Sequence, residues 1–276
     1  MMPRNAGVMG WPVDHSRSPA LHGFWLKAYG IDGNYVRLPV PPESLGAALG
    51  ELHRKGFAGV SLTVPHKEAA LSYMHALTPD ARQIGAVNTV FVGADGMLTG
   101  TNTDAFGFIT NLRSGAPTWR PEAGPAVVLG AGGAARAVCF ALQSAGVPEI
   151  RLINRTPARA EALAGALGAP LVAWPWEKIG QALEGAALLV NTTTQGMKGQ
   201  PPLDLDLSPL PPSAVVNDIV YVPLETPLLM AARARKNPVV DGLGMLLYQA
   251  QPSFAGWFGV HPEVTPALRA HVLASM

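Results

Sequence analysis

A glycine-rich segment near the middle of the chain has the spacing of a phosphate-binding loop. Gly130-Ala131-Gly132-Gly133-Ala134-Ala135 matches the pattern G-x-G-x-x-A and directly follows the apolar run Ala126-Val127-Val128-Leu129. Glycines there allow a tight turn and let backbone N–H groups approach a pyrophosphate at the positive end of the next helix. Glycine-rich turns also join ordinary strands to helices, so the position after a strand matters. We interpret the segment as a dinucleotide-binding loop.

The end of the next predicted strand indicates which dinucleotide would bind. NAD-specific sites usually place Asp or Glu about 20 residues further on, where the carboxylate binds the ribose hydroxyls. Here the strand 150–153 is followed by Asn154-Arg155-Thr156, with Arg159 one helical turn later. A carboxylate would repel a 2′-phosphate, whereas the planar cation of Arg155 can bind it. The alternative is a solvated arginine beside a threonine that caps the helix beginning at Pro157. NADP is the cofactor that this pattern favours.

Lys67 and Asp104 are the candidate proton-handling groups of the first half of the chain. Lys67 follows Thr63-Val64-Pro65 in the first turn of a predicted helix, where the helix dipole opposes its positive charge. That field favours the neutral amine, which suits a general acid or base, although a surface lysine is the alternative. Asp104 ends the cluster Thr101-Asn102-Thr103-Asp104, and taken alone it would be a helix cap.

Ser16 and Ser18 form a third polar cluster, Ser16-Arg17-Ser18-Pro19. Two hydroxyls beside a helix start can bind a carboxylate, because the helix N-terminus favours negative charge. The alternative is that Ser18 only caps the helix, with Pro19 at its first position. The sequence at this point leaves both interpretations open.

These groups are set in alternating strands and helices. In the first half, strands are predicted at 6–10, 34–40, 59–64 and 86–92, with helices at 18–29, 42–55 and from Pro65 or His66 onward. In the second half, strands are predicted at 126–129, 150–153, 171–173, 188–190, 214–219 and 239–240, with helices at 133–144 and 157–167. The proline-rich stretch 200–213 is interpreted as a surface connection. Alternation of this kind predicts βαβ units and parallel sheets.

Composition narrows the class of protein. Charged residues make up 14% of the 276-residue chain and hydrophobic residues 48%, which is unlike a disordered protein. A net charge of +1 gives no electrostatic basis for binding nucleic acid or an anionic membrane. With one cysteine, the chain cannot form an internal disulfide, so we expect a reducing, cytoplasmic location. We expect a soluble globular protein whose partner is a small molecule, in a monomer or a homodimer.

The motifs together resemble those of the shikimate dehydrogenases, in the same order and over nearly the whole chain. The matching segments are Ser16–Pro19, Thr63-Val64-Pro65-His66-Lys67, Gly85-Ala86-Val87-Asn88-Thr89, Asn102-Thr103-Asp104, Gly130–Ala135, Asn154-Arg155-Thr156, Asp218-Ile219-Val220-Tyr221 with Pro223 and Thr226-Pro227-Leu228, and Gly242-Leu243-Gly244-Met245-Leu246 with Gln249. Each motif is unspecific alone, but the ordered set is specific.

The resemblance implies an α/β fold of two domains. Residues 1–106 and 243–276 would form a mostly parallel substrate-binding domain, and residues 107–242 a Rossmann-like NADP-binding domain. The C-terminal helical segment would return to the first domain. The implied activity is the reversible, NADPH-dependent reduction of 3-dehydroshikimate to shikimate, in aromatic amino-acid biosynthesis.

The resemblance also implies roles for individual residues. Lys67 and Asp104 would be the catalytic pair, and no metal is implied. The residues expected at the substrate are Ser16, Ser18, Ser61, Thr63, Asn88, Tyr221 and Gln249. The residues expected at the cofactor are Gly130, Ala131, Gly132, Gly133, Ala134, Asn154, Arg155, Thr156, Arg159, Ile219 and Gly242.

Two departures from the family pattern bear on the substrate. Ser61 and Gly23 stand at positions where the family usually has Asn. The shorter hydroxyl of Ser61 keeps open an alternative, a quinate/shikimate dehydrogenase with a relaxed preference for substrate or cofactor. A cofactor-sensing regulator without turnover is a further alternative, disfavoured because both Lys67 and Asp104 are present.

Overall fold

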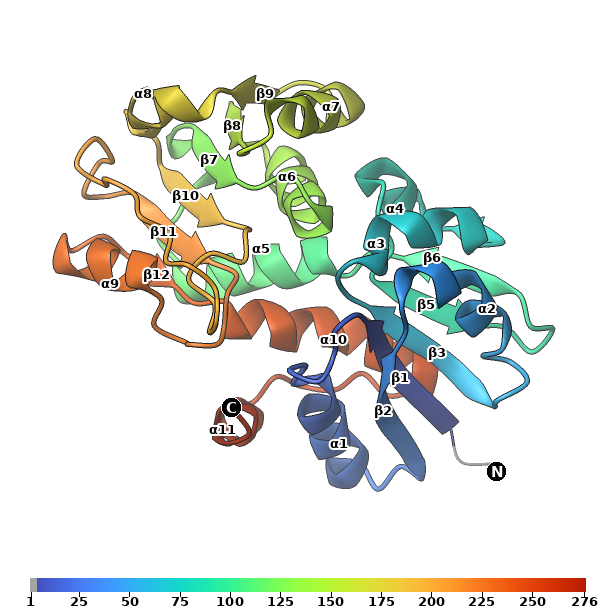
Figure 1. The fold of residues 1–276 in the computed structure, drawn as a ribbon. Helices are drawn as coiled ribbons and strands as arrows, with labels where there is room; N and C mark the ends of the chain where they lie inside the picture. Colours follow the sequence, from blue (N-terminus) through green and yellow to red (C-terminus); the bar gives the residue numbers. More distant parts are fainter. Residues whose placement is uncertain (1–3) are drawn as a thin grey trace. The chain divides into compact units, whose positions relative to one another are not determined.

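The chain folds into two compact units. The computed structural model describes residues 4–276, and it divides them into a first unit, which runs up to Asp104 and resumes with Leu246–Met276, and a second unit, Ala105–Met245 (Figure 1). Both units combine a six-stranded sheet with helices, which confirms the expected α/β class. Within the described residues, no helix is long and apolar enough to cross a membrane.

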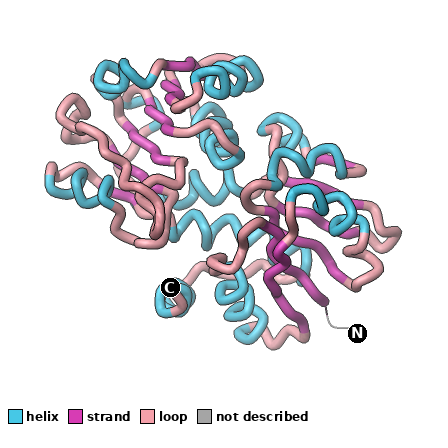
Figure 2. The backbone as a smooth tube through the Cα atoms, in the orientation of Figure 1, coloured by secondary structure: helices cyan, strands magenta, loops and turns pink. Residues whose placement is uncertain are grey.

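The sheet of the first unit has the strand order β2-β1-β3-β5-β6-β4. Figure 2 draws its strands in magenta. Its strands are β1 (Arg4–Gly10), β2 (Gly33–Pro39), β3 (Phe57–Leu62), β4 (Ala76–Leu77), β5 (Thr89–Val92) and β6 (Leu98–Thr101). The pairs β3–β5 and β5–β6 are antiparallel and the others parallel, so the sheet is mostly parallel as expected. The strand predicted at 86–92 begins only at Thr89, because Val87 donates its N–H to the Lys67 carbonyl instead of joining a ladder (2.7 Å).

The helices of the first unit are mostly short. They are α1 (Ser18–Ala28), α2 (Leu45–Gly50), α3 (His66–Ala69), α4 (Pro79–Ile84), the greater part of α10 (Leu243–Phe258), and α11 (Pro266–Ala274), with 3₁₀ turns at Pro42–Ser44 and Ala70–Tyr73. The helix predicted over 42–55 is therefore wrong at both ends. It begins as a 3₁₀ turn and its α-helical part stops at Gly50, where glycine is a poor helix former.

The core of the first unit fixes the sheet between its helices. Leu45 and Leu49 of α2 lie one helical turn apart and pack with Val60 and Leu62 of β3. On α10, the Trp257 indole donates to the Val90 carbonyl of β5 (3.0 Å). The C-terminal segment returns to this unit as predicted, since the Trp25 indole of α1 donates to the Glu263 carbonyl (3.0 Å).

The second unit has the strand order β12-β11-β10-β7-β8-β9, parallel throughout. Its strands are β7 (Ala126–Leu129), β8 (Ile150–Ile153), β9 (Leu171–Trp174), β10 (Leu188–Asn191), β11 (Val215–Asp218) and β12 (Val239–Val240). The chain runs outward from β7 on one side and resumes beside it at β10. This is the doubly wound order of a Rossmann fold, with its switch point between β7 and β10. The predicted Rossmann-like domain is confirmed.

Helices and one long connection complete the second unit. Its helices are α5 (Asp104–Gly115, after its first residue), α6 (Gly133–Ala145), α7 (Pro157–Leu167), α8 (Ile179–Leu183) and α9 (Pro227–Ala234), with 3₁₀ turns at Pro121–Ala123 and Trp176–Lys178. The stretch 200–213 contains no helix or strand, as predicted. It is not simply a surface connection, because Leu203, Leu207 and Leu210 are buried in the core beside β11 and α9.

Candidate active site

The glycine loop lies where the doubly wound sheet changes direction. β7 ends at Leu129 and α6 begins at Gly133, so Gly130, Ala131 and Gly132 form the turn between them. Gly130 has φ +108°, and a Cβ on it would lie 2.6 Å from Thr192 Oγ1. Only glycine fits this position without strain. The loop therefore leaves the N-terminus of the 13-residue helix α6 accessible for a pyrophosphate.

Substitutions at two glycines of this loop should affect different properties, one the stability of the fold and the other cofactor binding. A Cβ added to Gly132 would meet no atom within 4 Å, whereas one on Gly130 collides with Thr192. We expect Gly130→Ala to lower the free energy of unfolding by about 1–3 kcal/mol because of its positive φ. Gly132→Ala should keep wild-type stability yet weaken NADP⁺ binding at least about tenfold, because the added methyl group occupies the approach of the pyrophosphate. Urea unfolding and NADP⁺ titration test both, and unchanged NADP⁺ affinity in Gly132→Ala would contradict the loop assignment.

The segment after β8 presents two cations to solvent. Arg155 and Arg159 are exposed, and Asn154 Nδ2 donates to the Thr156 carbonyl (2.9 Å), which closes the turn before α7. Thr156 is the N-cap residue of α7, but its side chain makes no capping bond, so that part of the alternative considered from the sequence is wrong. The β8 end thus carries guanidinium groups and no carboxylate within 154–160, a donor set that fits a 2′-phosphate. Together with the glycine turn, these residues fit NADP.

Ile219 and Gly242 adjoin each other in the second unit. Ile219 follows β11, and a Cβ on Gly242 would lie 2.2 Å from the Ile219 carbonyl oxygen, so only glycine permits this close approach. Tyr221 is half-buried in the turn two residues later. All three are on the second unit, as are the glycine loop and the Asn154–Arg159 segment.

Asp218 is a buried carboxylate to which the sequence interpretation gave no role. Its oxygens accept bonds from Asn191 Nδ2 (3.0 Å), the Val220 N–H (3.0 Å) and Thr226 Oγ1 (2.7 Å). These bonds hold the turn that contains Ile219 and Val220. Burial nevertheless raises the pKa of Asp218 to about 6, the hydrogen bonds acting in the opposite direction. The only sequence signal was its place at the head of the Asp218-Ile219-Val220-Tyr221 motif.

The raised pKa of Asp218 predicts a pH-dependent effect on stability. Between its unfolded pKa near 4 and its folded pKa of about 6, the folded chain binds more protons here than the unfolded chain. Ionisation of Asp218 therefore lowers the free energy of unfolding as the pH rises through that interval. We expect Asp218→Asn to become more stable relative to wild type by roughly 2 kcal/mol between pH 4 and pH 7, as measured by urea unfolding.

A matched control is the exposed carboxylate Asp206. Its hydrogen bonds with Ser208 lower its pKa. Above pH 5, Asp206 is therefore ionised in both the folded and the unfolded chain. The difference in the free energy of unfolding between Asp206→Asn and wild type should therefore stay nearly constant from pH 5 to pH 7. An equally flat curve for Asp218→Asn would contradict the assignment of a raised pKa.

Lys67 and Asp104 form an ion pair in the first unit. Lys67 Nζ lies 2.6 Å from Asp104 Oδ2, with the lysine side chain 17% exposed and the carboxylate side chain 6%. Lys67 belongs to the four-residue helix α3, and Asp104 is the first residue of α5. Asn102 Oδ1 accepts the N–H of Asp104 (3.0 Å). The Asp104 carboxylate binds Lys67 and does not cap the helix. The structure thus joins the two residues that the sequence selected as proton-handling groups.

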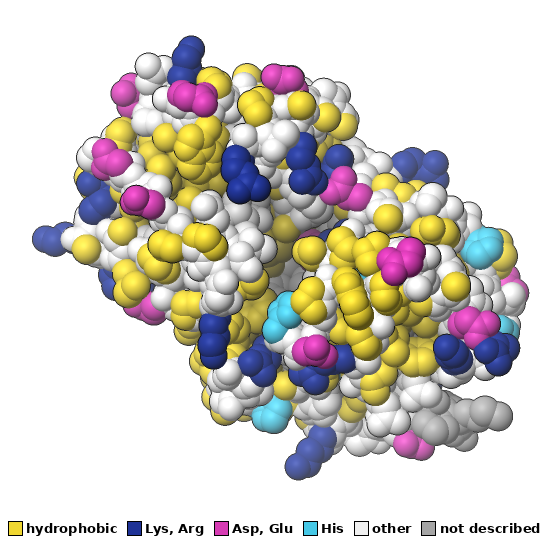
Figure 3. Space-filling model, viewed as in Figure 1, with side chains coloured by type: hydrophobic (Ala, Val, Ile, Leu, Met, Phe, Trp, Pro, Cys, Tyr) yellow, Lys and Arg dark blue, Asp and Glu magenta, His cyan; other side chains and the backbone are white. Residues whose placement is uncertain are grey.

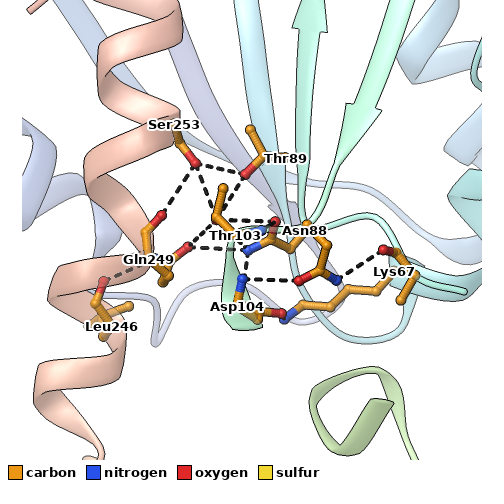
Figure 4. A network of polar contacts seen from close by, with 10 residues as sticks. Lys67, Asn88, Thr89, Thr103, Asp104, Leu246, Gln249 and Ser253 are labelled. Carbon is orange, nitrogen blue, oxygen red and sulfur yellow. Dashed lines mark hydrogen bonds and ion pairs between the residues drawn. The ribbon is translucent and has the colours of Figure 1, made fainter. Parts of the chain in front are cut away.

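Asn88 and Gln249 extend this pair into a buried network (Figure 4). Asn88 Nδ2 donates to Asp104 Oδ1 and Thr103 Oγ1 (both 2.9 Å) and lies 3.3 Å from Gln249 Oε1. Asn88 Oδ1 accepts the Thr103 N–H (2.8 Å), which fixes the orientation of the amide. Gln249 reaches the network from α10, 161 residues away in the sequence. The network holds the Asp104 carboxylate between an amide and an ammonium group.

Two hydroxyls behind this network were missed by the sequence interpretation. Thr89 Oγ1 lies 2.7 Å from Ser253 Oγ, and both are fully buried. Thr103 Oγ1 lies near both of them (3.4 and 3.5 Å). Thr89 was noted only as part of a motif, and nothing local marks Ser253, which follows Pro252 within α10.

The serines expected at a carboxylate are buried close to one another. Ser16 and Ser18 are each 7% exposed, and Ser16 Oγ accepts the Ser18 N–H (3.3 Å). Helix α1 begins at Ser18 without a capping bond from a side chain, so the capping alternative for Ser18 is wrong. Arg37 of β2, which the sequence did not single out, donates to the Ser16 carbonyl through Nε and Nη2 (3.2 and 2.7 Å). A guanidinium group therefore lies against the backbone of this serine pair.

Ser61 and Thr63 lie at the carboxyl end of β3. Ser61 is 8% exposed and accepts a bond from Tyr35 Oη (2.9 Å), whereas Thr63 is half-buried one residue beyond the strand. Eight of the selected residues thus belong to the first unit: Ser16, Ser18, Ser61, Thr63, Lys67, Asn88, Asp104 and Gln249. On the face shown in Figure 3, basic and acidic side chains are interspersed.

Known proteins of similar sequence identify the family of this chain. The family model described as shikimate dehydrogenase substrate binding domain matches residues 8–90, and the one described as shikimate / quinate 5-dehydrogenase matches residues 121–197. The chain is 61% identical over 271 residues to a shikimate dehydrogenase (NADP(+)) of Paramagnetospirillum magneticum, covering 98% of both chains. The chain belongs to the shikimate dehydrogenase family.

Solved structures of the family have the same fold. Shikimate 5-dehydrogenase of Thermus thermophilus, in complex with NADP(H) and shikimate, is 42% identical with a TM-score of 0.88, covering 99% of this chain and 100% of that one. Quinate dehydrogenase of Corynebacterium glutamicum, in complex with NAD, is 33% identical with a TM-score of 0.90, covering 99% of both chains. The recognition of a shikimate dehydrogenase from the sequence motifs is confirmed.

Proposed function

We propose that this member of the family is an NADP-dependent shikimate dehydrogenase, which reversibly reduces 3-dehydroshikimate to shikimate in the biosynthesis of aromatic amino acids. The observation that carries the proposal is the Lys67–Asp104 pair, held at 2.6 Å inside the Asn88–Gln249 network. A carbinol that loses hydride must also lose its hydroxyl proton, and a paired amine and carboxylate can accept it.

The substrate would be held by the first unit. Ser16 and Ser18 would bind its carboxylate, and Tyr221 of the second unit is proposed as a further substrate residue. Ser61, Thr63, Asn88 and Gln249 would bind ring hydroxyls through their hydroxyl and amide groups, and Asn88 and Gln249 already belong to the network around Asp104. Residues 1–106 and 243–276 are accordingly proposed as the substrate domain, and residues 107–242 as the NADP domain.

Lys67 and Asp104 would share the management of one proton. Asp104 is fixed by Asn88, so it orients the ammonium group of Lys67 and accepts a bond from the substrate hydroxyl. The two groups are coupled through a 2.6 Å contact, so the proton belongs to the pair rather than to either residue. When NADPH is bound, it supplies the hydride, and the protein aligns the carbonyl carbon with it.

NADP would be held by the second unit. Gly130, Ala131, Gly132, Gly133 and Ala134 would surround the pyrophosphate at the N-terminus of α6. Asn154, Arg155, Thr156 and Arg159 would bind the adenosine 2′-phosphate. Ile219 and Gly242 would line the nicotinamide, with Asp218 holding the turn beneath it. A cytoplasmic location and a monomeric or homodimeric state complete the proposal.

The proposal is tested by offering purified protein shikimate or quinate with NADP⁺ or NAD⁺ and following reduced nicotinamide by absorbance. Turnover of shikimate with NADP⁺ is expected to be the most efficient combination. Absence of shikimate turnover with either cofactor would refute the proposal. Comparable turnover of quinate would favour the second candidate, a quinate/shikimate dehydrogenase, for which the departure at Ser61 is the relevant observation.

A further inference from the structure

Tyr35 is a buried polar residue without a role in the chemistry described so far. It lies in β2 and is 8% exposed. Its ring is stacked on that of His22, with centroids 4.0 Å apart and planes 10° apart. Its hydroxyl donates to Ser61 Oγ at 2.9 Å. A phenol packed in this way has little freedom to turn its hydroxyl elsewhere.

Tyr35 is the donor in its hydrogen bond with Ser61. Burial raises the pKa of Tyr35 above its usual value, so the phenol keeps the proton that it donates to Ser61 Oγ. Burial lowers the pKa of His22 to about 3, so the stacked ring is neutral. Neither ring nitrogen of His22 has a hydrogen-bond partner among the described residues, so the imidazole does not compete for the phenol proton.

Ser61 is consequently available as a hydrogen-bond donor to a second partner. Because Tyr35 supplies the proton of their shared bond, the Ser61 hydroxyl keeps its own proton for a different acceptor. An Asn at this position, usual in the family, would present a donor and an acceptor at once. Ser61 with Tyr35 behind it presents a donor, which favours an oxygen with free lone pairs, such as a carboxylate oxygen.

Tyr35 also connects Ser61 to the other serines. Its hydroxyl has a second hydrogen-bonding contact, with the Ser18 side chain. Two residues further along β2, Arg37 holds the Ser16 carbonyl, and alternate residues of a strand face the same way. One strand therefore supports all three serines from behind.

We propose that Tyr35 is a positioning residue for the substrate carboxylate, which it serves by orienting the Ser61 hydroxyl as a hydrogen-bond donor. The inference rests on the proposed function and goes beyond it in two respects. It moves Ser61 from the ring hydroxyls to the carboxylate end of the substrate, and it adds Tyr35 as the residue through which Ser61 acts. Tyr35 itself need not contact the substrate.

The test is a double-mutant cycle of Tyr35→Phe and Ser61→Ala. Phe keeps the ring on His22 and removes only the hydroxyl. Tyr35→Phe should raise the KM for shikimate about fivefold to tenfold, the range expected for one misoriented hydrogen bond to a charged group. The kcat and the KM for NADP⁺ should stay within about twofold. If Tyr35 acts mainly through Ser61, Tyr35→Phe should raise the KM for shikimate much less in the Ser61→Ala background than in wild type, the remainder being the effect of its contact with Ser18.

The matched control is Tyr29→Phe, which removes a hydroxyl that accepts the Glu263 N–H at the exposed end of α1. It should leave the KM for shikimate unchanged. Additive effects of the two substitutions in the cycle would overturn the proposal, as would a fall in kcat at unchanged KM. Shikimate methyl ester distinguishes the substrate group: Tyr35→Phe should affect the ester less than shikimate, and an equal effect on both would refute the carboxylate assignment.

Binding without turnover separates this inference from the proposed function. Shikimate is titrated into wild type and Tyr35→Phe in the absence of cofactor, and the Kd is expected to rise by the same factor as the KM. A wild type that binds shikimate without turning it over would contradict the proposed function alone. Equal Kd values for the two proteins would contradict the role of Tyr35, whatever the activity.

Discussion

Lys67→Ala is expected to lower kcat for shikimate oxidation by about 10²–10⁴, the usual contribution of a positioned acid or base. The amine lies 2.6 Å from Asp104, and both side chains are largely withdrawn from water. Water could not replace it with the same geometry. The KM for shikimate should change by less than about tenfold, because the other proposed contacts remain in place. Steady-state kinetics in both directions measure the two parameters separately.

The same substitution leaves Asp104 without its cation, so stability must be measured alongside activity. Removing one partner of a largely buried pair destabilises a protein, here moderated by the hydrogen bond that Asn88 still donates to Asp104. Lys67→Met, which keeps the aliphatic stem, should fold as well as Lys67→Ala or better and be equally inactive. Lys27→Ala, at an exposed lysine of α1, is the control and should match wild type. A normal kcat with a greatly raised KM would assign Lys67 to substrate binding instead.

The parts of the fold that the sequence predicted well are those with continuous apolar strands. The unit β7–α6–β8–α7 was predicted within one residue, because its strands are short buried runs and its helices begin after Gly132 and at Pro157. Of the antiparallel pair β5–β6, only β5 was predicted, because Leu98-Thr99-Gly100-Thr101 is short and contains a glycine, which weakens a strand signal. Helix α4 was missed although Thr78 caps its start and Gly85, at φ +70°, ends it. Thr78 and Gly85 could therefore have been used to predict this helix from the sequence.

The candidate site was predictable wherever a motif is contiguous. Lys67 could be named because it lies in the first turn of a predicted helix, and Asp104 because it ends a polar cluster. Their contact at 2.6 Å depends on the positions of α3 and α5. Tyr35 and Ser253 could not be named, because an aromatic residue in a strand and a serine in an apolar helix look like ordinary core positions. Their partners lie 26 and 164 residues away, which only the tertiary fold reveals.

The pairing of those distant residues explains why the departure at Ser61 is tolerable. A serine is too short to replace the amide of Asn by itself, and a buried hydroxyl without a fixed partner would be free to rotate. Tyr35 gives it a partner at 2.9 Å and a defined direction. Ser61 and its buried partner Tyr35 thus form one structural feature, although the sequence shows only the departure at Ser61.

Arg155→Ala is expected to raise the KM for NADP⁺ by roughly 10- to 100-fold while leaving the KM for NAD⁺ within about twofold. Charge-assisted bonds from a guanidinium to a phosphate contribute roughly 1.5–3 kcal/mol, which corresponds to that range. Arg155 is exposed at the end of β8, so the substitution removes no packing, and thermal unfolding should be unchanged. Kinetics with each cofactor at saturating shikimate give the comparison.

Two further variants decide what the Arg155 result means. Arg159 lies one helical turn away and is also exposed. If the two cations share the 2′-phosphate, Arg159→Ala should raise the KM for NADP⁺ by a smaller factor and again spare the KM for NAD⁺. The control is Arg233→Ala on α9, where the exposed arginine is paired with Glu225. It should leave the KM for NADP⁺ and for NAD⁺ unchanged. Higher salt should weaken NADP⁺ binding more in wild type than in Arg155→Ala, because screening acts on the charge that the variant has lost. Equal increases in KM for NADP⁺ and NAD⁺ would instead place Arg155 at the adenine ribose or pyrophosphate common to both.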